Sequence, residues 1–263
     1  MKILEKIEYK LDFASVPHKR MLDKPNEDRL LIDKENGIFI ILDGVTRVHK
    51  EYEDMPYESA AREVGDILLK EVHSYILKHL SDCEPETLLR EAIRAANEEI
   101  RIYRQKKNIS DWVFYPSTLG IISILQDNKL HYISVGDCLG VLLRRSSRIL
   151  FGREFALEAI DLNKVTKQER YEKYCNHPKN KLSYTVYNGD EEVMDGIEYS
   201  FIDIHEGDTV ILASDGIGEF LKYEKCALLK EKSAEEMILL SEEYDLPPYA
   251  EYADDKTLLK LSF

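Results

Sequence analysis

The pattern of apolar and polar positions divides the first part of the chain into strands followed by helices. Apolar and β-branched residues alternate with polar ones, or form short apolar runs, in residues 6–14, 29–33 and 37–44. Two longer segments then repeat apolar residues at helical spacing, one through Val64 and Leu68 and one, after Pro85, through Leu88 and Ala92. This spacing predicts two amphipathic helices that pack on a sheet.

The second half of the chain returns to strands. Meander-like antiparallel strands are predicted for residues 117–125, 130–137, 139–145 and 148–152. Residues 153–195 are polar and irregular, which predicts a variable flap with one short helix. Strands at 197–204 and 208–216, helices around Cys226 and Met237, and a last strand at 257–263 follow. Blocks of strands and helices without a linker predict an α+β fold in a single domain over residues 1–263.

Two of these strands end in the same way. "GIFIILDG" stops at Asp43 and Gly44, and "TVILASDG" stops at Asp215 and Gly216. Tight-turn chemistry is one explanation, because Asp-Gly favours hairpin turns and glycine supplies a positive φ. Neither pair, however, is followed by a second alternating run at hairpin distance. The alternative is that both carboxylates face a shared site, and that glycine lets a ligand approach the backbone.

Other acidic residues stand at comparable positions beside strands. The full set is Glu27, Asp28, Asp43, Asp137, Asp215, Asp254 and Asp255. Most of them adjoin strongly apolar strands, where a buried carboxylate is costly unless it is paired or coordinated. Hard divalent cations such as Mg²⁺ and Mn²⁺ prefer oxygen ligands of this kind. The pattern therefore predicts a paired-metal site.

Composition narrows the possible partners. The formal net charge is −14 and the pI is about 5.1, which argues against binding to a nucleic acid backbone. The N-terminus lacks the continuous apolar core of a signal peptide, and no window predicts a membrane span. The four cysteines are scattered without metal-ligand spacing. We therefore expect a soluble, cytoplasmic protein that binds neither nucleic acid nor membrane.

An ordered set of motifs resembles a known family across nearly the whole chain. The series "NED", "GIFIILDG", "STLGIISI", "ISVGDCLGVLL", "GDTVILASDG" and "DDKTLLKLSF" is similar, in order and spacing, to the type 2C or PPM metal-dependent serine/threonine protein phosphatases. The resemblance implies a four-layer α-β-β-α sandwich, in which two stacked antiparallel sheets are flanked by helices. It also implies hydrolysis of phosphoserine and phosphothreonine in a phosphorylated protein substrate, by a water that Mn²⁺ or Mg²⁺ activates.

The resemblance also implies roles for single residues. Asp43 matches the aspartate that bridges two metals, and the Gly44 carbonyl matches the ligand beside it. Asp215 and Asp254 match the aspartates that complete one metal's shell, so Asp43, Asp215 and Asp254 are the expected catalytic set. Glu27 and Asp28 match the acidic pair that holds metal-bound waters. Asp137 matches a residue of a third metal site that some members have. The resemblance therefore implies two or three metal ions per chain. Asp255 stands where the family often has Asn and is interpreted as a neighbour.

The chain departs from the family at the phosphate clamp. The arginine that commonly precedes the acidic pair by four residues is replaced by Asp23. Arg20 and Lys24 are the candidate replacements as phosphate ligands, and a solvated connecting loop is the alternative. Ser214 lacks the surroundings of a nucleophile and is interpreted as structural. Two other functions stay open: a catalytically weak or inactive phosphatase-like module that binds a partner, and a two-metal hydrolase of a small phosphoester.

Overall fold

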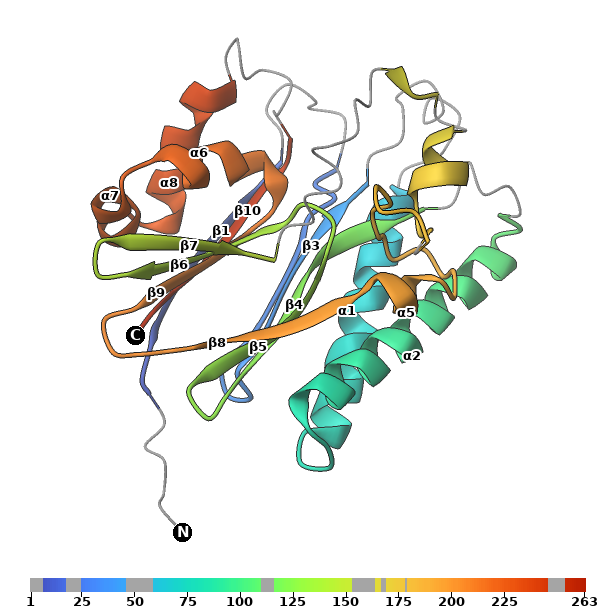
Figure 1. Cartoon of the computed structure of the whole chain (residues 1–263), viewed down its shortest axis with the longest axis horizontal. Coiled ribbons are helices and arrows are strands. Elements are labelled where there is room, and N and C mark those ends of the chain that lie inside the picture. Colours follow the sequence, from blue (N-terminus) through green and yellow to red (C-terminus); the bar gives the residue numbers. More distant parts are fainter. Residues whose placement is uncertain are drawn as a thin grey trace.

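A computed structural model of the chain shows ten strands among the residues that it describes, arranged as two antiparallel sheets (Figure 1). The described residues are 7–17, 25–45, 59–109, 116–152, 164–166, 169–177, 179–245 and 254–263. One sheet has the order β1-β10-β9-β6-β7, with bounds Lys10–Val16, Lys256–Ser262, Thr209–Ala213, Leu139–Arg144 and Ser147–Phe151. The other has the order β2-β3-β4-β5-β8, with bounds Arg29–Asp33, Ile38–Gly44, Thr118–Gln126, Lys129–Val135 and Glu198–Asp203.

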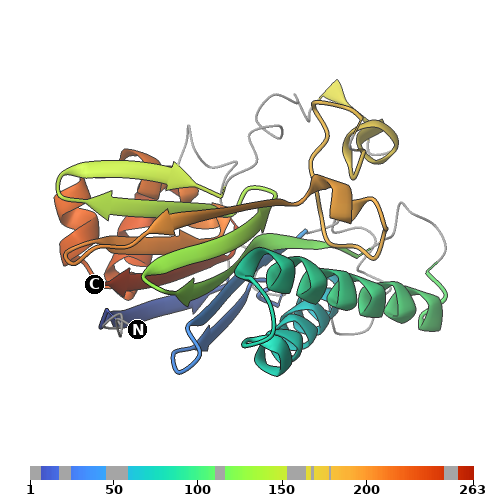
Figure 2. The ribbon, with the colours of Figure 1, turned by 60° about the horizontal axis from the view of Figure 1, so that its bottom comes forward.

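Helices cover the outer face of each sheet, so that the predicted four-layer α-β-β-α sandwich is confirmed (Figures 1 and 2). Helices α1 (Ala60–His79) and α2 (Pro85–Lys106) lie side by side on the β2-β3-β4-β5-β8 sheet. Helices α6 (Gly218–Tyr223), α7 (Cys226–Glu231) and α8 (Ala234–Ser241) pack on the other sheet. The described residues also form short helical segments, namely η4 (Arg170–Tyr174), α5 (Val193–Gly196), η5 (Asp215–Ile217) and η6 (Glu242–Asp245).

Burial on two faces explains the continuous apolar runs of the central strands. In β10, Leu258 packs toward α6, α7 and α8, whereas Leu259 and Leu261 point into the core between the sheets. In β9, Val210 and Leu212 likewise join the inner core, and Ile211 joins the outer one. A strand between two apolar layers needs apolar residues at every position, since successive side chains point to opposite faces.

The structure corrects the expected meander. β4 and β5 form a hairpin whose two turn residues, Asp127 and Asn128, both have positive φ, as a type I′ turn requires. β6 does not continue this sheet but pairs with β9 in the other one. The chain crosses between sheets after β5, at Gly136, whose φ is 74°. Local alternation could not reveal this change, because it is the same on both sides of the crossing.

The described part of the region predicted as an irregular flap contains regular segments. Within the described residues, it contains two short helical segments, η4 and α5, where the sequence suggested one. Near its end, Asn97 of α2 accepts a hydrogen bond from the Gly189 backbone, and Arg104 of α2 forms an ion pair with Asp190 at 3.1 Å. Tyr187 is fully buried and pairs with Thr118 at the start of β4. This segment is therefore fastened both to the helix layer and to the sheet.

Candidate metal centre

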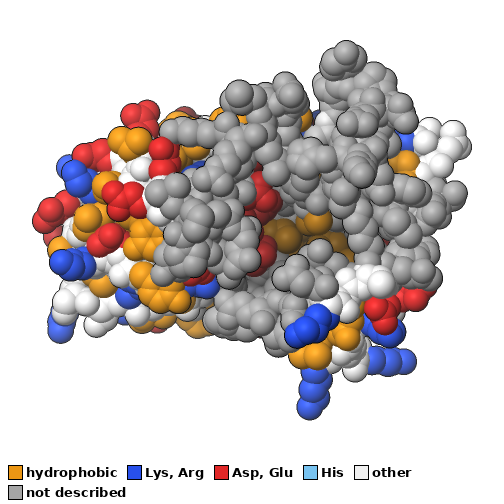
Figure 3. Space-filling view, turned by 90° about the horizontal axis from the view of Figure 1, so that it is seen from above, with side chains coloured by type: hydrophobic (Ala, Val, Ile, Leu, Met, Phe, Trp, Pro, Cys, Tyr) orange, Lys and Arg blue, Asp and Glu red, His pale blue; other side chains and the backbone are white. Residues whose placement is uncertain are grey.

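Three aspartates meet at one end of the sandwich. Asp43 lies in β3 and Asp137 follows β5, so both come from one sheet, whereas Asp215 follows β9 of the other sheet. One carboxylate oxygen from each lies within 4.8 Å of the other two. Figure 3, which looks at the molecule from above, shows acidic side chains near the middle of this face. The two sheets thus bring together residues that are far apart in the sequence.

The surroundings of two of these aspartates, Asp43 and Asp215, disfavour their negative charge. Each is only partly accessible to solvent, and burial is the largest cause that raises the pKa of Asp43 and of Asp215 well above its usual value. For Asp43 the next cause is the charge of Asp215, and for Asp215 it is the charges of Asp137 and Asp254; a hydrogen bond with Asp43 offsets the shift at Asp215 only in part. A divalent cation between the carboxylates would reverse this repulsion.

One carboxylate atom in the cluster also lacks a partner. Oδ1 of Asp215 is buried and has no hydrogen-bond partner among the described residues. Buried polar atoms are normally satisfied, so this oxygen is available to bind a ligand. The donor set consists of carboxylates alone, which suits Mg²⁺ or Mn²⁺. The residues at this end of the sandwich therefore fit a divalent metal.

Asp28 is held beside the cluster by hydroxyl groups. Its Oδ2 accepts a hydrogen bond from the Ser214 hydroxyl at 2.7 Å, and the Ser214 Oγ in turn accepts one from the Thr257 backbone at 2.9 Å. Burial raises the pKa of Asp28 to about 7; the hydrogen bonds with Ser214 and Thr257 oppose this shift, and the charges of Asp255 and Asp254 add to it. The structural role that the sequence suggested for Ser214 is therefore confirmed, and the contact shows which acidic side chain this serine holds.

Glu27 is anchored at both its backbone and its side chain. Its backbone N–H donates to Oδ2 of Asp255 at 2.9 Å. Its carboxylate accepts a hydrogen bond from the hydroxyl of Ser59, the residue that caps the N-terminus of α1. Glu27 is 2% exposed. The start of α1 and the last strand together hold this acidic side chain in place.

The glycine of each Asp-Gly pair allows a close approach and does not form a left-handed turn. Neither Gly44 nor Gly216 has a positive φ. A Cβ on Gly44 would lie 2.6 Å from Cβ of Glu27, and a Cβ on Gly216 would lie 2.1 Å from the carbonyl oxygen of Asp255. Of the two explanations that the sequence left open, the structure supports a shared site, but the groups that approach the glycines are Glu27 and Asp255 of the protein and not a ligand.

The structure gives separate outcomes for Asp254, for its neighbour Asp255, and for the candidate phosphate ligands. Asp254 is not among the three aspartates whose oxygens lie within 4.8 Å, although its charge contributes to the raised pKa of Asp215. The neighbouring Asp255 is 2% exposed and binds the Glu27 backbone, which fits its interpretation as a neighbour of the ligands. Arg20 and Lys24, the candidate phosphate ligands, lie outside the described residues.

Sequence reasoning missed the side chains that hold the ligands in place. Thr118 is fully buried, and its Oγ1 donates to the backbone carbonyl of Asp43 at 2.6 Å. Ser59 and Ser214 have comparable roles toward Glu27 and Asp28. A hydroxyl at a strand or helix end is a common feature of sequences, so these residues carry no signal until the fold brings their partners to them.

Cys138 lies next to Asp137 but is not a candidate nucleophile. It is fully buried, and burial, followed by the charge of Asp43, raises the pKa of its thiol well above the usual value. A reactive cysteine needs a lowered pKa and access to solvent. All four cysteines are free.

Comparisons with known proteins identify the fold on which this aspartate cluster is built. No protein-family model matches the sequence, and no curated protein matches it significantly. Solved structures do match over nearly the whole chain. The serine/threonine phosphatase PstP/Ppp of Mycobacterium tuberculosis has a TM-score of 0.67 at 19% identity, and the alignment covers 98% of this chain and 99% of that one. The chain has the fold of the PPM-type phosphatases.

Two further structures support this assignment of the fold. The PPM Ser-Thr phosphatase MsPP from Mycobacterium smegmatis has a TM-score of 0.61 at 15% identity, over 97% of this chain and 98% of that one. The catalytic domain of PstP in complex with two manganese ions has a TM-score of 0.64 at 18% identity, over 97% of each chain. The fold that the motifs implied is therefore confirmed.

Proposed function

We propose that this protein is a metal-dependent phosphatase that removes phosphate from phosphoserine and phosphothreonine in proteins. The observation that carries the proposal is the cluster of Asp43, Asp137 and Asp215, in which a buried carboxylate oxygen has no partner among the described residues. The PPM-type fold and the manganese ions of the PstP complex support it. The proposal treats residues 1–263 as one catalytic domain, with residues 153–195 as its variable segment.

In this proposal Asp43, Asp215 and Asp254, with the Gly44 carbonyl, hold Mn²⁺ or Mg²⁺, and Asp137 contributes to a third ion. When bound, the ions supply an activated water and neutralise the charge that develops on the phosphoryl group. Glu27 and Asp28 orient the solvent at the site through carboxylates that the protein holds rigidly. Arg20 or Lys24 contacts the substrate phosphate in place of the usual arginine.

Other findings bear on partners and compartment. No helix in the described part of the chain is long and apolar enough to cross a membrane. The four free cysteines are compatible with a reducing compartment, and we propose that the protein acts in the cytoplasm on a phosphorylated protein.

Release of phosphate from a phosphothreonine peptide, with Mn²⁺, with Mg²⁺ and with a chelator, tests this function. An aryl phosphate and a nucleotide are assayed in parallel, with Asp215→Asn as the inactive variant and the exposed Asp203→Asn as its control. We expect peptide hydrolysis that requires the metal and is lost only in Asp215→Asn. Hydrolysis of the small phosphoesters alone would indicate a different substrate class. Metal binding without hydrolysis of any compound would indicate a binding module.

A further inference from the structure

Arg29 connects the acidic loop to helix α1. It is the first residue of β2 and directly follows Asp28. Its Nη1 donates to two backbone carbonyls of the loop, that of Asn26 at 3.0 Å and that of Asp28 at 2.6 Å. Its Nε donates to Oδ1 of Asp66 on α1 at 2.5 Å. One guanidinium group therefore joins the backbone of the acidic loop to the helix that covers the sheet.

The direction of the Arg29 side chain excludes direct contact with a substrate at the metal centre. Arg29 pairs with Leu42 across the β2-β3 ladder, so both side chains point to the same face of the sheet. That face is covered by α1, because Cγ of Arg29 lies 3.1 Å from the position of a Cβ on Gly65. Asp43 follows Leu42 and points to the opposite face. Arg29 therefore contacts the loop from the face of the sheet that α1 covers, opposite to the face toward which Asp43 points.

Gly65 supports this arrangement. It lies within α1, where alanine would favour the helix more strongly than glycine does. A methyl group at this position would crowd the Arg29 side chain. The guanidinium itself is well enclosed, since the Arg29 side chain is 13% exposed and its Nη2 is buried without a hydrogen-bond partner among the described residues. The helix surface therefore accommodates an arginine, and its planar fork reaches the loop and the helix at once.

We propose that Arg29 is a positioning residue for the metal centre. By holding the carbonyls of Asn26 and Asp28 in place, it keeps the Glu27 and Asp28 carboxylates directed at the water that the metals bind, and Asp66 fixes the guanidinium that does so. This inference rests on the proposed function, because it assigns Arg29 a role in the same site. Partners that orient metal ligands from behind commonly change metal affinity ten- to a hundredfold when they are removed.

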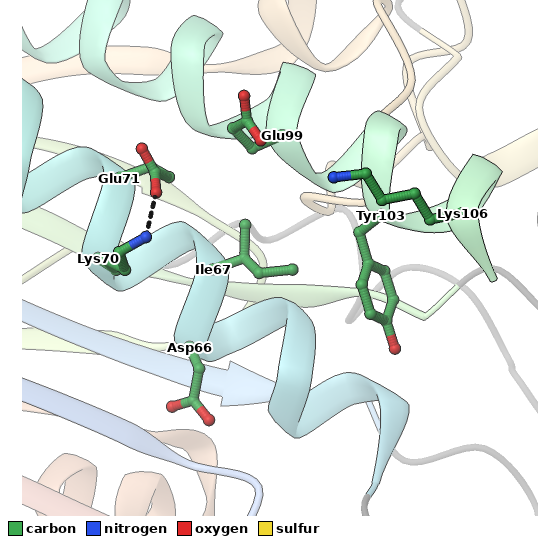
Figure 4. A pocket seen from close by; sticks show the side chains of 7 residues that line it. All are labelled: Asp66, Ile67, Lys70, Glu71, Glu99, Tyr103 and Lys106. Carbon is green, nitrogen blue, oxygen red and sulfur yellow. Dashed lines mark hydrogen bonds and ion pairs between the residues drawn. The ribbon is translucent and has the colours of Figure 1, made fainter.

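Asp66 provides a second place at which the same connection can be perturbed. Its side chain is 59% exposed, and it borders a groove of about 330 Å³ between α1 and α2 (Figure 4). In Figure 4 the Asp66 carboxylate points away from Tyr103 and Lys106, two of the three groove residues that α2 contributes. An exposed residue of this kind can be replaced without disturbing the core, so Asp66→Asn should fold even if a change at Arg29 does not.

Calorimetric titration of the metal-free protein with Mn²⁺ tests the inference without any assay of activity. The variants are Arg29→Lys, which keeps the charge but removes the fork, Asp66→Asn, and the two combined. Arg144→Lys is the matched control, because Arg144 also joins a carboxylate, that of Asp208 at 2.7 Å, to a backbone carbonyl, that of Asp203 at 2.6 Å. It lies at the end of β6 that is remote from Asp137.

We expect Arg29→Lys to weaken Mn²⁺ binding about tenfold and Asp66→Asn to weaken it about threefold. The combined variant should bind no more weakly than Arg29→Lys, since both changes break one connection. Arg144→Lys should bind Mn²⁺ like the wild type while its melting temperature falls. At saturating Mn²⁺, the kcat and KM of Arg29→Lys for a phosphopeptide should return to wild-type values.

Several results would overturn the inference. Equal Mn²⁺ affinity in wild type and Arg29→Lys would show that the arginine only stabilises the fold, and an equal loss in Arg144→Lys would show that the effect is general. If Arg29→Lys does not fold, wild-type affinity in Asp66→Asn would have the same meaning. A wild-type protein that binds no Mn²⁺ would instead overturn the proposed function, and this inference with it.

Discussion

Replacing Asp215 by asparagine should stabilise the metal-free protein while it destroys the response to metal. The three carboxylates of the cluster have oxygens within 4.8 Å of one another. At this separation, two unit charges repel by about 3 kcal/mol with an effective dielectric constant of 20. Asp215→Asn removes two of the three pairs, but protonation and partial access of solvent reduce the gain. We therefore expect the free energy of unfolding to rise by about 2 kcal/mol without metal.

Thermal unfolding at pH 7.5, with a chelator and with excess Mn²⁺, measures both effects. A gain of about 2 kcal/mol corresponds to a melting temperature about 4 to 8 °C higher in the chelator. Mn²⁺ at a hundred times its Kd should stabilise the wild type by about 2.7 kcal/mol and leave Asp215→Asn nearly unchanged. The order of the two melting temperatures should therefore invert when metal is added.

The control for this prediction is Asp203→Asn. The Asp203 side chain is 61% exposed and its carboxylate lies 3.9 Å from Lys129, so its loss should change the free energy of unfolding by less than about 0.5 kcal/mol in either condition. A lower melting temperature for Asp215→Asn in the chelator would refute the argument that repulsion strains the empty cluster. A full Mn²⁺ response in this variant would show that the metal binds elsewhere.

Four further predictions concern the same end of the molecule. The folded state raises the pKa of Asp28 from its ordinary value near 4 to about 7. Between about pH 4 and 7 the metal-free protein therefore binds more protons when folded than when unfolded, and its free energy of unfolding should fall as the pH rises through this range. Asp254→Asn should lower phosphatase activity more than Asp255→Asn, since the latter keeps an acceptor for the amide that Asp255 binds. Gly216→Ala should cost about 1 to 3 kcal/mol of stability in chemical denaturation, because its Cβ would meet a backbone carbonyl. Asp23→Arg should raise kcat/KM on a phosphopeptide about tenfold by adding a charge-assisted contact.

Each of these has a contrary outcome. Stability that rises with pH in the chelator would contradict the burial of Asp28 as a neutral acid. Equal activities of the Asp254 and Asp255 variants would remove the reason to assign the first as a ligand. Wild-type stability of Gly216→Ala would show that the backbone can move apart at little cost. An unchanged kcat/KM in Asp23→Arg would mean that the phosphate is held by other groups.

The elements that the sequence predicted well are those whose pattern is local. β3 and β9 are buried on both faces, so their apolar runs are visible without knowledge of the fold. Helices α1 and α2 follow from apolar spacing, and Pro85 stands at the start of α2 as expected. The division of β4 to β7 between two sheets could not be predicted, because strand partners are set by the path of the chain and not by its alternation.

The site shows the same limit. The acidic residues were visible because a carboxylate beside an apolar strand conflicts with its surroundings. Arg29 was not, because its partner Asp66 is 37 residues away and an arginine at the start of a strand is unremarkable in a sequence. Ser214 was correctly interpreted as structural, but its partner could not be predicted, since Asp28, which its hydroxyl binds, is 186 residues away.

The two Asp-Gly pairs have a common explanation in the way the acidic segments pack. Gly44 makes room for Glu27, and Gly216 makes room for the backbone of Asp255. These two incoming segments are themselves joined, because the Glu27 amide donates to the Asp255 carboxylate. The ends of β3 and β9, which belong to different sheets, are thus connected through two acidic segments that lie against their glycines. A side chain at either glycine would separate a strand end from its neighbour, and the aspartate that precedes it would lose its place in the cluster. One chain ends two strands with Asp-Gly because each sheet must supply a carboxylate and leave space for the other ligands beside it.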